Sequence, residues 1–382
     1  MPYITVKQSP AVHQLTLEEI LAGPVDLSKF TIAHHESNTR TYCSTNIPPS
    51  LSHVASPETL ISLLEQFVAD HQALYQQDRS QLYTTFHIPK KSGGLREINA
   101  PVPELMHALR VLKGLLETRF LALYHTSAFA YVPGRCAVDA VRKHQRNQSR
   151  WFLKVDFSNF FGSTTLPFLL SMLSQIFPFS SVCETERGRS ALEAALDLCF
   201  LHGGLPQGTP ISPMLTNLMM IPVDYTLFNT LRNFQRQTFV YTRYADDLLI
   251  SSRYGFRPEA VLSLIQNTLA VFSAPFLIKE EKTRYGSSAG SNWNLGVMLN
   301  KDNEITIGHK NKKRFRAMVC SYLLDRQNGT PWSLHDVQVL AGLMSYYAMV
   351  EKPYVEKVIG YNNQKYHTDL LAALKEDQKA LS

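Results

Sequence analysis

Apolar residues recur at helical spacing in four stretches of the chain. In the clearest, Pro103–Tyr124, they return at three- and four-residue steps, at Leu105, Leu109, Leu112, Leu116, Phe120 and Leu123. This spacing predicts a helix with one buried face, which serves the core rather than a site. The same argument predicts helices at Pro57–Tyr75, at Leu192–Phe200 and, after a glycine-rich start, at Pro210–Asn233.

Strand-like segments stand between these helices. Leu82–Ile88 and Leu95–Asn99 flank a Lys-Lys-Ser-Gly-Gly turn and predict a hairpin with a basic tip. Trp151–Val155 is a short apolar strand that ends on Asp156, and Phe239–Ser252 predicts a second hairpin. The alternation favours an α+β fold, and the chain carries no GxGxxG or Walker loop.

Composition narrows the class of protein. With 382 residues, 45% hydrophobic and 18% charged, the chain is expected to form two or three packed subdomains. Nothing resembling a leader peptide or a membrane-spanning apolar run is present, so secretion and membrane insertion are disfavoured. The five cysteines are scattered without a CxxC pair, which argues against disulfides and zinc and favours a reduced cytosol.

The charge is mildly positive, and its distribution is more informative than its sum. The formal net charge is +6, which permits a polyanionic partner without proving one. The densest basic cluster is His309–Arg316, and a second is formed by Lys90 and Lys91 with Arg96. Both are candidates for contacts with phosphate, although a solvated surface is the alternative for each.

Three aspartates carry the candidate chemistry. Asp156 ends one predicted strand, and Asp246 and Asp247 lie at the bend of the second hairpin. If the two strands are neighbours in a sheet, the carboxylates converge and suit Mg²⁺, which prefers oxygen ligands and completes its shell with water and phosphates. Two such ions could promote an in-line phosphoryl transfer. The alternative is that Asp-Asp at a bend is ordinary turn chemistry.

The residues around these aspartates resemble the sequence blocks of reverse transcriptases, and the match is close to the retron and group II intron-like bacterial enzymes. Tyr241–Ser251 resembles the catalytic hairpin, Lys154–Phe161 the first catalytic block and Gly204–Pro213 the segment that positions nucleotide and template. The resemblance runs from about Leu82 to Tyr361. It implies a right-hand polymerase with an N-terminal extension at 1–75, fingers and palm at 76–305, and a helical thumb with the C-terminal segment at 306–382.

The resemblance also implies roles for individual residues. Asp156, Asp246 and Asp247 would be catalytic and would hold two Mg²⁺ ions, or Mn²⁺, with the backbone carbonyl of Phe157. Residues implied to bind the nucleotide are Lys91, Arg96, Phe161 as the gate beneath the sugar, Gln207, Gly208 and Lys282. Residues implied to bind the template and primer are Leu295, Gly296, Lys310, Lys312, Lys313 and Arg314. For the gate, the alternative is that neighbouring Phe160 faces the site, because adjacent strand residues point to opposite faces.

Departures from the family pattern narrow the subgroup. Retron enzymes usually carry an Asn-Ala-x-x-His block where this chain has Asp139–His144, and Val-Thr-Gly where it has Asn294-Leu295-Gly296. The short stretch after Tyr361 leaves no room for the maturase and endonuclease regions of intron proteins. We therefore expect a compact, cytoplasmic bacterial reverse transcriptase, retron-like or of the stand-alone defence-associated groups.

This reading implies specific partners and leaves rival functions open. The expected partners are dNTPs, an RNA template that is a cognate non-coding RNA, the DNA product and an effector protein, with oligomerisation left open and no membrane. One rival is an RNA-dependent RNA polymerase or an untemplated nucleotidyl transferase, which shares the carboxylates. The other is a catalytically silent RNA-binding scaffold on a polymerase fold.

Overall fold

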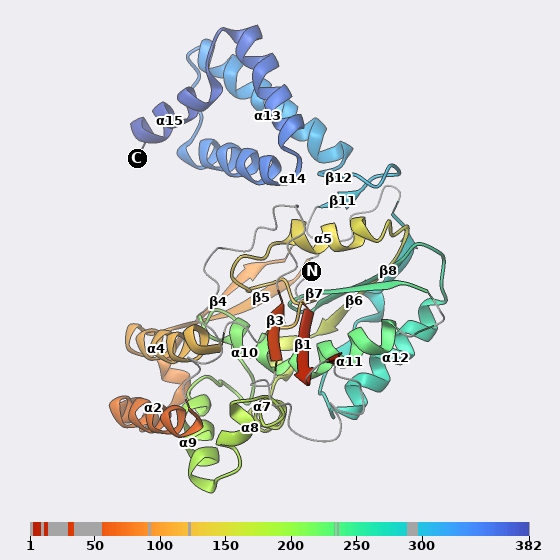
Figure 1. The fold of residues 1–382 in the computed structure, drawn as a ribbon. Coiled ribbons are helices and arrows are strands. Elements are labelled where there is room, and N and C mark those ends of the chain that lie inside the picture. The colour runs from red at the N-terminus through yellow and green to blue at the C-terminus, as the bar shows by residue number, and fades with distance from the viewer. Residues whose placement is uncertain are drawn as a thin grey trace. The chain divides into compact units, whose positions relative to one another are not determined.

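The chain forms two compact units whose segments alternate along the sequence (Figure 1). The computed structural model describes residues 3–8, 11–13, 30–33, 56–90, 93–120, 124–232, 234, 237–288 and 297–381. The first unit comprises Met1–Cys136, Leu153–Ile250 and Phe256–Tyr285; the second comprises Ala137–Phe152, Ser251–Gly255 and Gly286–Ser382. The residue ranges of fingers, palm and thumb that the sequence resemblance implies stay a prediction.

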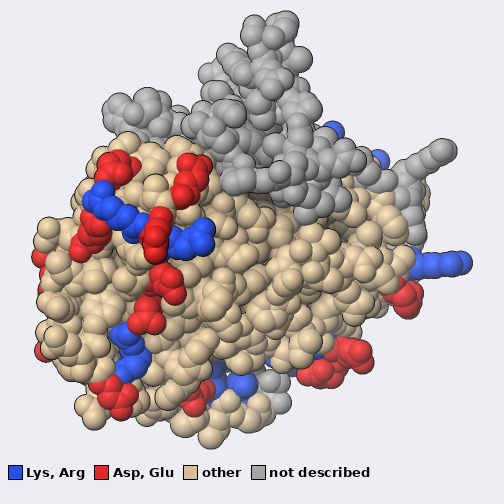
Figure 2. Space-filling model, turned by 90° about the horizontal axis from the view of Figure 1, so that it is seen from below, with Lys and Arg blue, Asp and Glu red and all other residues tan. Residues whose placement is uncertain are grey.

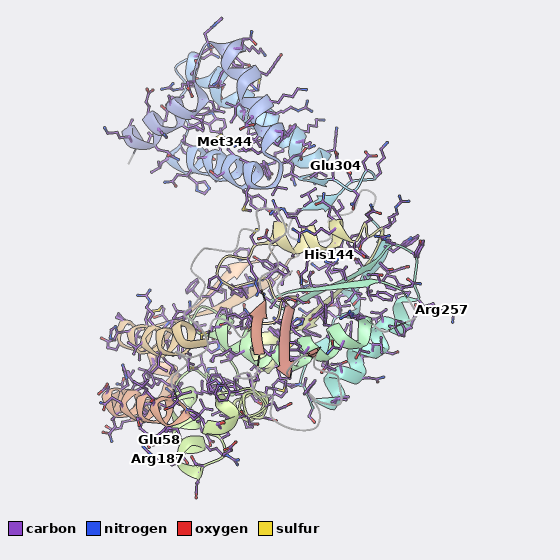
Figure 3. All side chains as sticks on the ribbon, in the orientation of Figure 1. Glu58, His144, Arg187, Arg257, Glu304 and Met344 are labelled. Carbon is purple, nitrogen blue, oxygen red and sulfur yellow. The ribbon has the colours of Figure 1, made fainter. Side chains whose placement is uncertain are left out.

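The first unit opens with a small sheet and a helical layer. The antiparallel strands β1 (Tyr3–Gln8), β2 (Ala11–His13) and β3 (Phe30–Ala33) pair in the order β2-β1-β3. Helix α2 (Pro57–Asp70) begins where the Ser56 side chain accepts a hydrogen bond from the Thr59 N–H, and its buried face is apolar. Arg187 of α9 (Glu186–Asp197) points toward Glu58 of α2, 2.6 Å away, and joins the two helices (Figure 3).

The predicted basic hairpin is present. After α3 (Gln72–Tyr75) and the 3₁₀ turn Arg79–Leu82, strand β4 (Tyr83–Pro89) pairs antiparallel with β5 (Leu95–Pro101). Gly93 and Gly94 both have positive φ and close the turn. Phe86, Ile88 and Leu95 are 46%, 40% and 60% exposed, so this hairpin presents apolar as well as charged side chains to its surroundings.

The segments that carry the three aspartates belong to a five-stranded sheet. Strands β10 (Arg284–Ser287), β6 (Trp151–Ser158), β8 (Asp247–Ser252) and β7 (Phe239–Tyr244) are neighbours in that order, and β9 (Leu277–Ile278) pairs with β6. Strand β6 continues to Ser158, so Asp156 lies inside it rather than at its end. The two strands that carry the aspartates, β6 and β8, are adjacent.

Helices supply the rest of the first unit's core. The helix predicted over Pro210–Asn233 is two helices, α10 (Ser212–Met219) and α11 (Ile221–Arg232), because Pro222 fits a first helical turn but cannot continue a preceding helix. The helix predicted from Pro103 is α4 (Pro103–Phe120). The remaining helices are α6 (Phe160–Ser163), α7 (Leu166–Leu173), α8 (Phe179–Val182), α12 (Pro258–Val271) and the 3₁₀ turn Glu280–Lys282.

The second unit is mainly helical. It contains α5 (Ala137–Arg146), the short antiparallel pair β11 (Met298–Leu299) and β12 (Ile305–Thr306), and helices α13 (His309–Gln327), α14 (Leu334–Tyr366) and α15 (Leu370–Leu381). Helix α14 is kinked at Glu351, whose backbone is non-helical, two residues before Pro353. Within the described ranges, no helix has both the length and the apolar character needed to cross a membrane.

A buried histidine anchors α5 within this unit (Figure 3). His144 is fully buried, with its Nδ1 atom 2.6 Å from the Ser251 hydroxyl, which in turn donates to the Ser149 hydroxyl. Burial, aided by Lys143, lowers the pKa of His144 to about 3, so the imidazole is neutral at ordinary pH. This histidine, from the stretch that departs from the retron pattern, therefore has a packing role.

Candidate active site

The turn between β7 and β8 brings the three aspartates together. Ala245 adopts a left-handed backbone conformation with φ +58°, and Asp247 is the first residue of β8. The Phe157 N–H donates to the Asp246 carbonyl at 3.2 Å, which fixes the turn beside Asp156 on β6. The carboxylates thus gather because adjacent strands carry them to one edge of the sheet.

Burial and mutual proximity raise the pKa values of two of these acids, Asp246 and Asp247. Burial raises the pKa of Asp246, and the Asp247 and Asp156 carboxylates raise it further. Burial likewise raises the pKa of Asp247; the Lys154 ammonium opposes this rise and Asp156 adds to it. Three negative groups are thus held close together in a poorly solvated place, and a cation would relieve that strain.

Three lysine side chains form ion pairs with two of these carboxylates. The Lys154 ammonium lies 2.7 Å from Asp247 Oδ2, and those of Lys279 and Lys282 each lie 3.3 Å from an Asp156 oxygen. Although partial burial opposes it, the Asp156 carboxylate raises the pKa of Lys282. The sequence had singled out only Lys282, since Lys154 and Lys279 become neighbours of the carboxylates through the pairing of β6 with β8 and β9.

The donor set fits a hard divalent cation. Asp247 Oδ1 is buried and has no hydrogen-bond partner, so one carboxylate oxygen is free for a ligand. Among the described residues, no group of three or more acidic, histidine or cysteine side chains is arranged to hold a metal ion. Mg²⁺ does not require such a group, because it binds through one or two carboxylates and takes its other ligands from water and substrate phosphates. An open site of this kind suits an ion delivered with a nucleotide.

A buried polar network supports the catalytic turn from behind. Arg243 and Asp224 are both fully buried and form an ion pair of 2.8 Å. Arg243 also donates to the Asn217 side chain at 3.0 Å and to the carbonyl of Ala245 at 3.3 Å, which ties α10 and α11 to the turn. The hydrophobic pattern of the sequence could not predict this network. The pattern expects an apolar residue at a buried position, whereas the network buries an arginine there.

Tyr241 completes the network, and removal of its hydroxyl should lower the free energy of unfolding. Its hydroxyl donates to Asp224 Oδ1 at 2.6 Å, while Arg243 holds the same carboxylate independently. Tyr241→Phe should therefore lower the free energy of unfolding by about 1–2 kcal/mol and leave the folded enzyme active. Urea denaturation measures the change in the free energy of unfolding. Tyr254→Phe, at a tyrosine 70% exposed, is the control, and equal effects in both variants would contradict this role.

The segment Gly204–Pro213, expected to position the nucleotide, is anchored on both sides. The Leu205 N–H donates to the Phe161 carbonyl at 3.0 Å, and a Cβ on Gly204 would lie 2.2 Å from the Gly162 carbonyl oxygen, so only glycine permits the approach. At the other end, the Asn99 N–H of β5 donates to the Gln207 carbonyl at 2.8 Å. Gly208 has φ +117° and abuts the Asn99 carbonyl, so this segment joins α6 to the basic hairpin.

The two candidate gate residues differ clearly in environment. Phe160 is 2% exposed and its ring packs 4.8 Å from that of Phe276, whereas Phe161 is only partly buried. Both lie in α6, so the strand-alternation argument that motivated the alternative does not apply: neighbouring helical residues are not on opposite faces. Phe160 belongs to the core, and Phe161 is the aromatic side chain of the pair with free surface.

A tyrosine that the sequence did not single out lies within electrostatic reach of both the hairpin and the carboxylates. Tyr131 has φ +57° and is 57% exposed. Burial of part of the ring raises its pKa, the Asp246 carboxylate raises it further and the Arg96 guanidinium opposes this. Arg96, exposed on β5, and Asp246 are therefore both within electrostatic reach of one side chain. Lys91, the other cation assigned to the triphosphate, lies outside the described residues.

The residues predicted to bind the template and primer lie in different environments. Lys310, Lys313 and Arg314 are exposed on α13, at its N-terminal end. Lys312 is instead paired with Glu351 at the kink of α14 and lies over the Tyr354 ring, 4.8 Å from its centre. Leu295 and Gly296, expected to grip the primer, lie outside the described residues.

Some basic residues of the first unit are less suited to phosphate because they are paired with acids. On the face shown in Figure 2, most lysine and arginine side chains lie beside aspartate or glutamate. In the first unit, Arg187 pairs with both Glu58 and Glu65, and Arg79 pairs with Asp197. Such pairing neutralises the cations locally and leaves little net field to attract a polyanion.

Comparisons with known proteins show what the chain is similar to. The family model described as "Reverse transcriptase (RNA-dependent DNA polymerase)" matches residues 88–315. The chain is 25% identical over 323 residues to the retron Ec83 reverse transcriptase of Escherichia coli, covering 82% of this chain and 96% of that protein. It is 29% identical over 301 residues to the retron Mx65 reverse transcriptase of Myxococcus xanthus, covering 76% and 67%. A solved telomerase from Candida albicans, in complex with a telomeric RNA fragment, aligns over 85% of this chain and 64% of that chain at 12% identity and a TM-score of 0.42.

Proposed function

The chain belongs to the reverse transcriptase family as a bacterial, retron-like RNA-directed DNA polymerase, and from that premise we propose that it extends a primer on a cognate non-coding RNA by two-metal phosphoryl transfer. The observation that carries the mechanism is the gathering of Asp156, Asp246 and Asp247 at one sheet edge, with a partner-free oxygen on Asp247. Two Mg²⁺ ions held by these carboxylates and the Phe157 carbonyl would activate the primer 3′-hydroxyl and neutralise the leaving pyrophosphate.

The chain's own residues orient the nucleotide. Arg96 and Lys91 of the hairpin bind the triphosphate, and Lys282 stands on the carboxylate side, 3.3 Å from Asp156, where it can stabilise charge on the leaving group. Gln207 and Gly208 bring backbone close to the nascent base pair. Phe161 lies beneath the sugar, where it excludes a 2′-hydroxyl. These contacts lower the barrier by positioning, which is most of what phosphoryl transfer requires.

The wider biological proposal has two sources. The chain matches the retron Ec83 and Mx65 reverse transcriptases over two thirds or more of their length, which supports an RNA template and a DNA product. The bacterial cytoplasmic location and the use in antiphage defence with an effector protein are proposed from the resemblance of the sequence blocks alone. The template is the partner on which the assignment depends. Sequencing the nucleic acid that copurifies with the protein would identify it.

One experiment separates this function from its rivals. Purified protein receives an RNA template with an annealed primer, with dNTPs or rNTPs, and the same reactions are repeated without template. Template-dependent dNTP incorporation supports the proposal. Equal incorporation without template indicates a nucleotidyl transferase, preference for rNTPs indicates an RNA polymerase, and binding of RNA without any incorporation indicates a silent scaffold.

The exposed cations of α13 should set the salt dependence of RNA binding. We expect replacement of Lys310, Lys313 and Arg314 by glutamine to reduce the slope of log affinity against log salt by up to about three, equally for all sequences, since each phosphate contact releases a counter-ion. Fluorescence anisotropy across a salt series measures the slope.

Lys312→Gln is the matched control for this series. Because Lys312 is paired with Glu351, its loss should lower the free energy of unfolding while the salt slope stays as in the wild type. If the triple variant also keeps the wild-type slope, the cations of α13 form only a solvated face.

A further inference from the structure

Three lysine ammonium groups face the three carboxylates of the first unit. Lys154 pairs with Asp247 at 2.7 Å, while Lys279 and Lys282 both contact Asp156 at 3.3 Å. With one charge on each side chain, three negative groups meet three positive ones. The cluster is therefore close to neutral in the protein alone, and a free divalent cation gains less from entering it than three bare carboxylates would offer.

Lys279, like Lys154, is a lysine of this set that the proposed reaction does not use. Its backbone N–H donates to the Asp156 carbonyl at 2.8 Å, next to the pairing of β9 with β6, so its position beside the carboxylate is fixed by the main chain. Its side chain is 26% exposed, against 46% for Lys282. The ammonium contacts Asp156 Oδ1, an oxygen that a metal ion would need.

We propose, resting on the proposed function, that Lys279 is a built-in counter-ion of Asp156 that competes with divalent metal and makes metal loading depend on the nucleotide. For a free ion to bind, the ammonium must leave Oδ1. A metal ion that arrives with a triphosphate brings negative charge of its own, which stabilises both the ion and the released ammonium. The site then fills when substrate is present.

The plain alternative is that the Lys279–Asp156 contact is a partly exposed ion pair of little consequence. The two hypotheses predict different changes in the metal affinity of the free protein when the Lys279 ammonium is removed. A competing ammonium weakens metal binding, so its removal tightens it. An inconsequential pair changes nothing.

The test measures Mn²⁺ binding to the full chain, free of nucleic acid and nucleotide, by electron paramagnetic resonance. We expect Lys279→Met to lower the dissociation constant about fivefold, and Lys279→Arg, which keeps the charge, to stay near the wild type. When the metal is supplied as a preformed Mn²⁺–dATP complex, wild type and Lys279→Met should differ by less than about twofold.

Controls separate the possible failures. Arg257→Met removes an exposed cation at the start of α12, in the same unit, and should leave Mn²⁺ binding unchanged (Figure 3). If Asp156→Asn does not impair Mn²⁺ binding, the proposed metal site fails. If Asp156→Asn abolishes binding but Lys279→Met binds as the wild type does, only the counter-ion role is overturned. Should Lys279→Met not fold, as judged by circular dichroism, Lys279→Gln takes its place with the same expected tightening.

Discussion

Asp156→Asn should reduce RNA-templated primer extension by at least about a thousandfold while the protein stays folded. The change removes one anionic oxygen from a site proposed to hold two dications, and so removes both metal affinity and charge neutralisation in the transition state. Asp246→Asn should have the same effect, because both carboxylates lie at one sheet edge beside Asp247. Single-turnover primer extension with Mg²⁺ measures the loss.

The fold should survive these changes because the backbone contacts of the site do not depend on the carboxylates. The Phe157 N–H still donates to the Asp246 carbonyl, and the Lys279 N–H still donates to the Asp156 carbonyl. Asp70→Asn, at an exposed acid at the end of α2, is the matched control and should keep full activity. Activity within tenfold of the wild type in either active-site variant would show that these acids do not hold the metal.

The elements that position the site follow largely from local sequence patterns. The amphipathic helix from Pro103 has the spacing that burial on one face requires. The hairpin of β7 and β8 and the strand that carries Asp156 are instead short apolar runs that are buried along most of their length. The break before Pro222 lay within an otherwise continuous helical pattern, so the apolar spacing alone did not indicate it.

What the sequence did not predict depends on contacts between distant segments. Lys279 acts on Asp156 only because β9 pairs with β6, and Tyr131 comes near Asp246 only because its loop is tied to β7, where the Phe129 N–H donates to the Arg243 carbonyl at 2.9 Å. A lysine or tyrosine considered alone is more often a solvated side chain. Tertiary pairing, rather than local pattern, makes these residues part of the site.

The choice between Phe160 and Phe161 shows how the structure sharpens a prediction about selectivity. We expect Phe161→Val to raise the relative use of rNTPs by on the order of 100-fold, because a smaller side chain leaves room for the 2′-hydroxyl. Incorporation of dNTPs should fall less than about tenfold, since the carboxylates, Gln207 and the triphosphate contacts remain. Steady-state incorporation of matched dNTP and rNTP gives the ratio.

Phe160→Val separates a gate from a core residue at the neighbouring position. Phe160 is 2% exposed and packs against Phe157 and Phe276, so its truncation should lower the free energy of unfolding by about 2–3 kcal/mol and leave the dNTP to rNTP ratio unchanged. Phe161 is only partly buried, and its backbone carbonyl is held by the Leu205 N–H, so its truncation should change selectivity with a smaller loss of stability. If Phe160→Val is instead the variant that loses selectivity, the gate lies one residue earlier, and the backbone contact of α6 with Gly204 and Leu205 must open in the working enzyme.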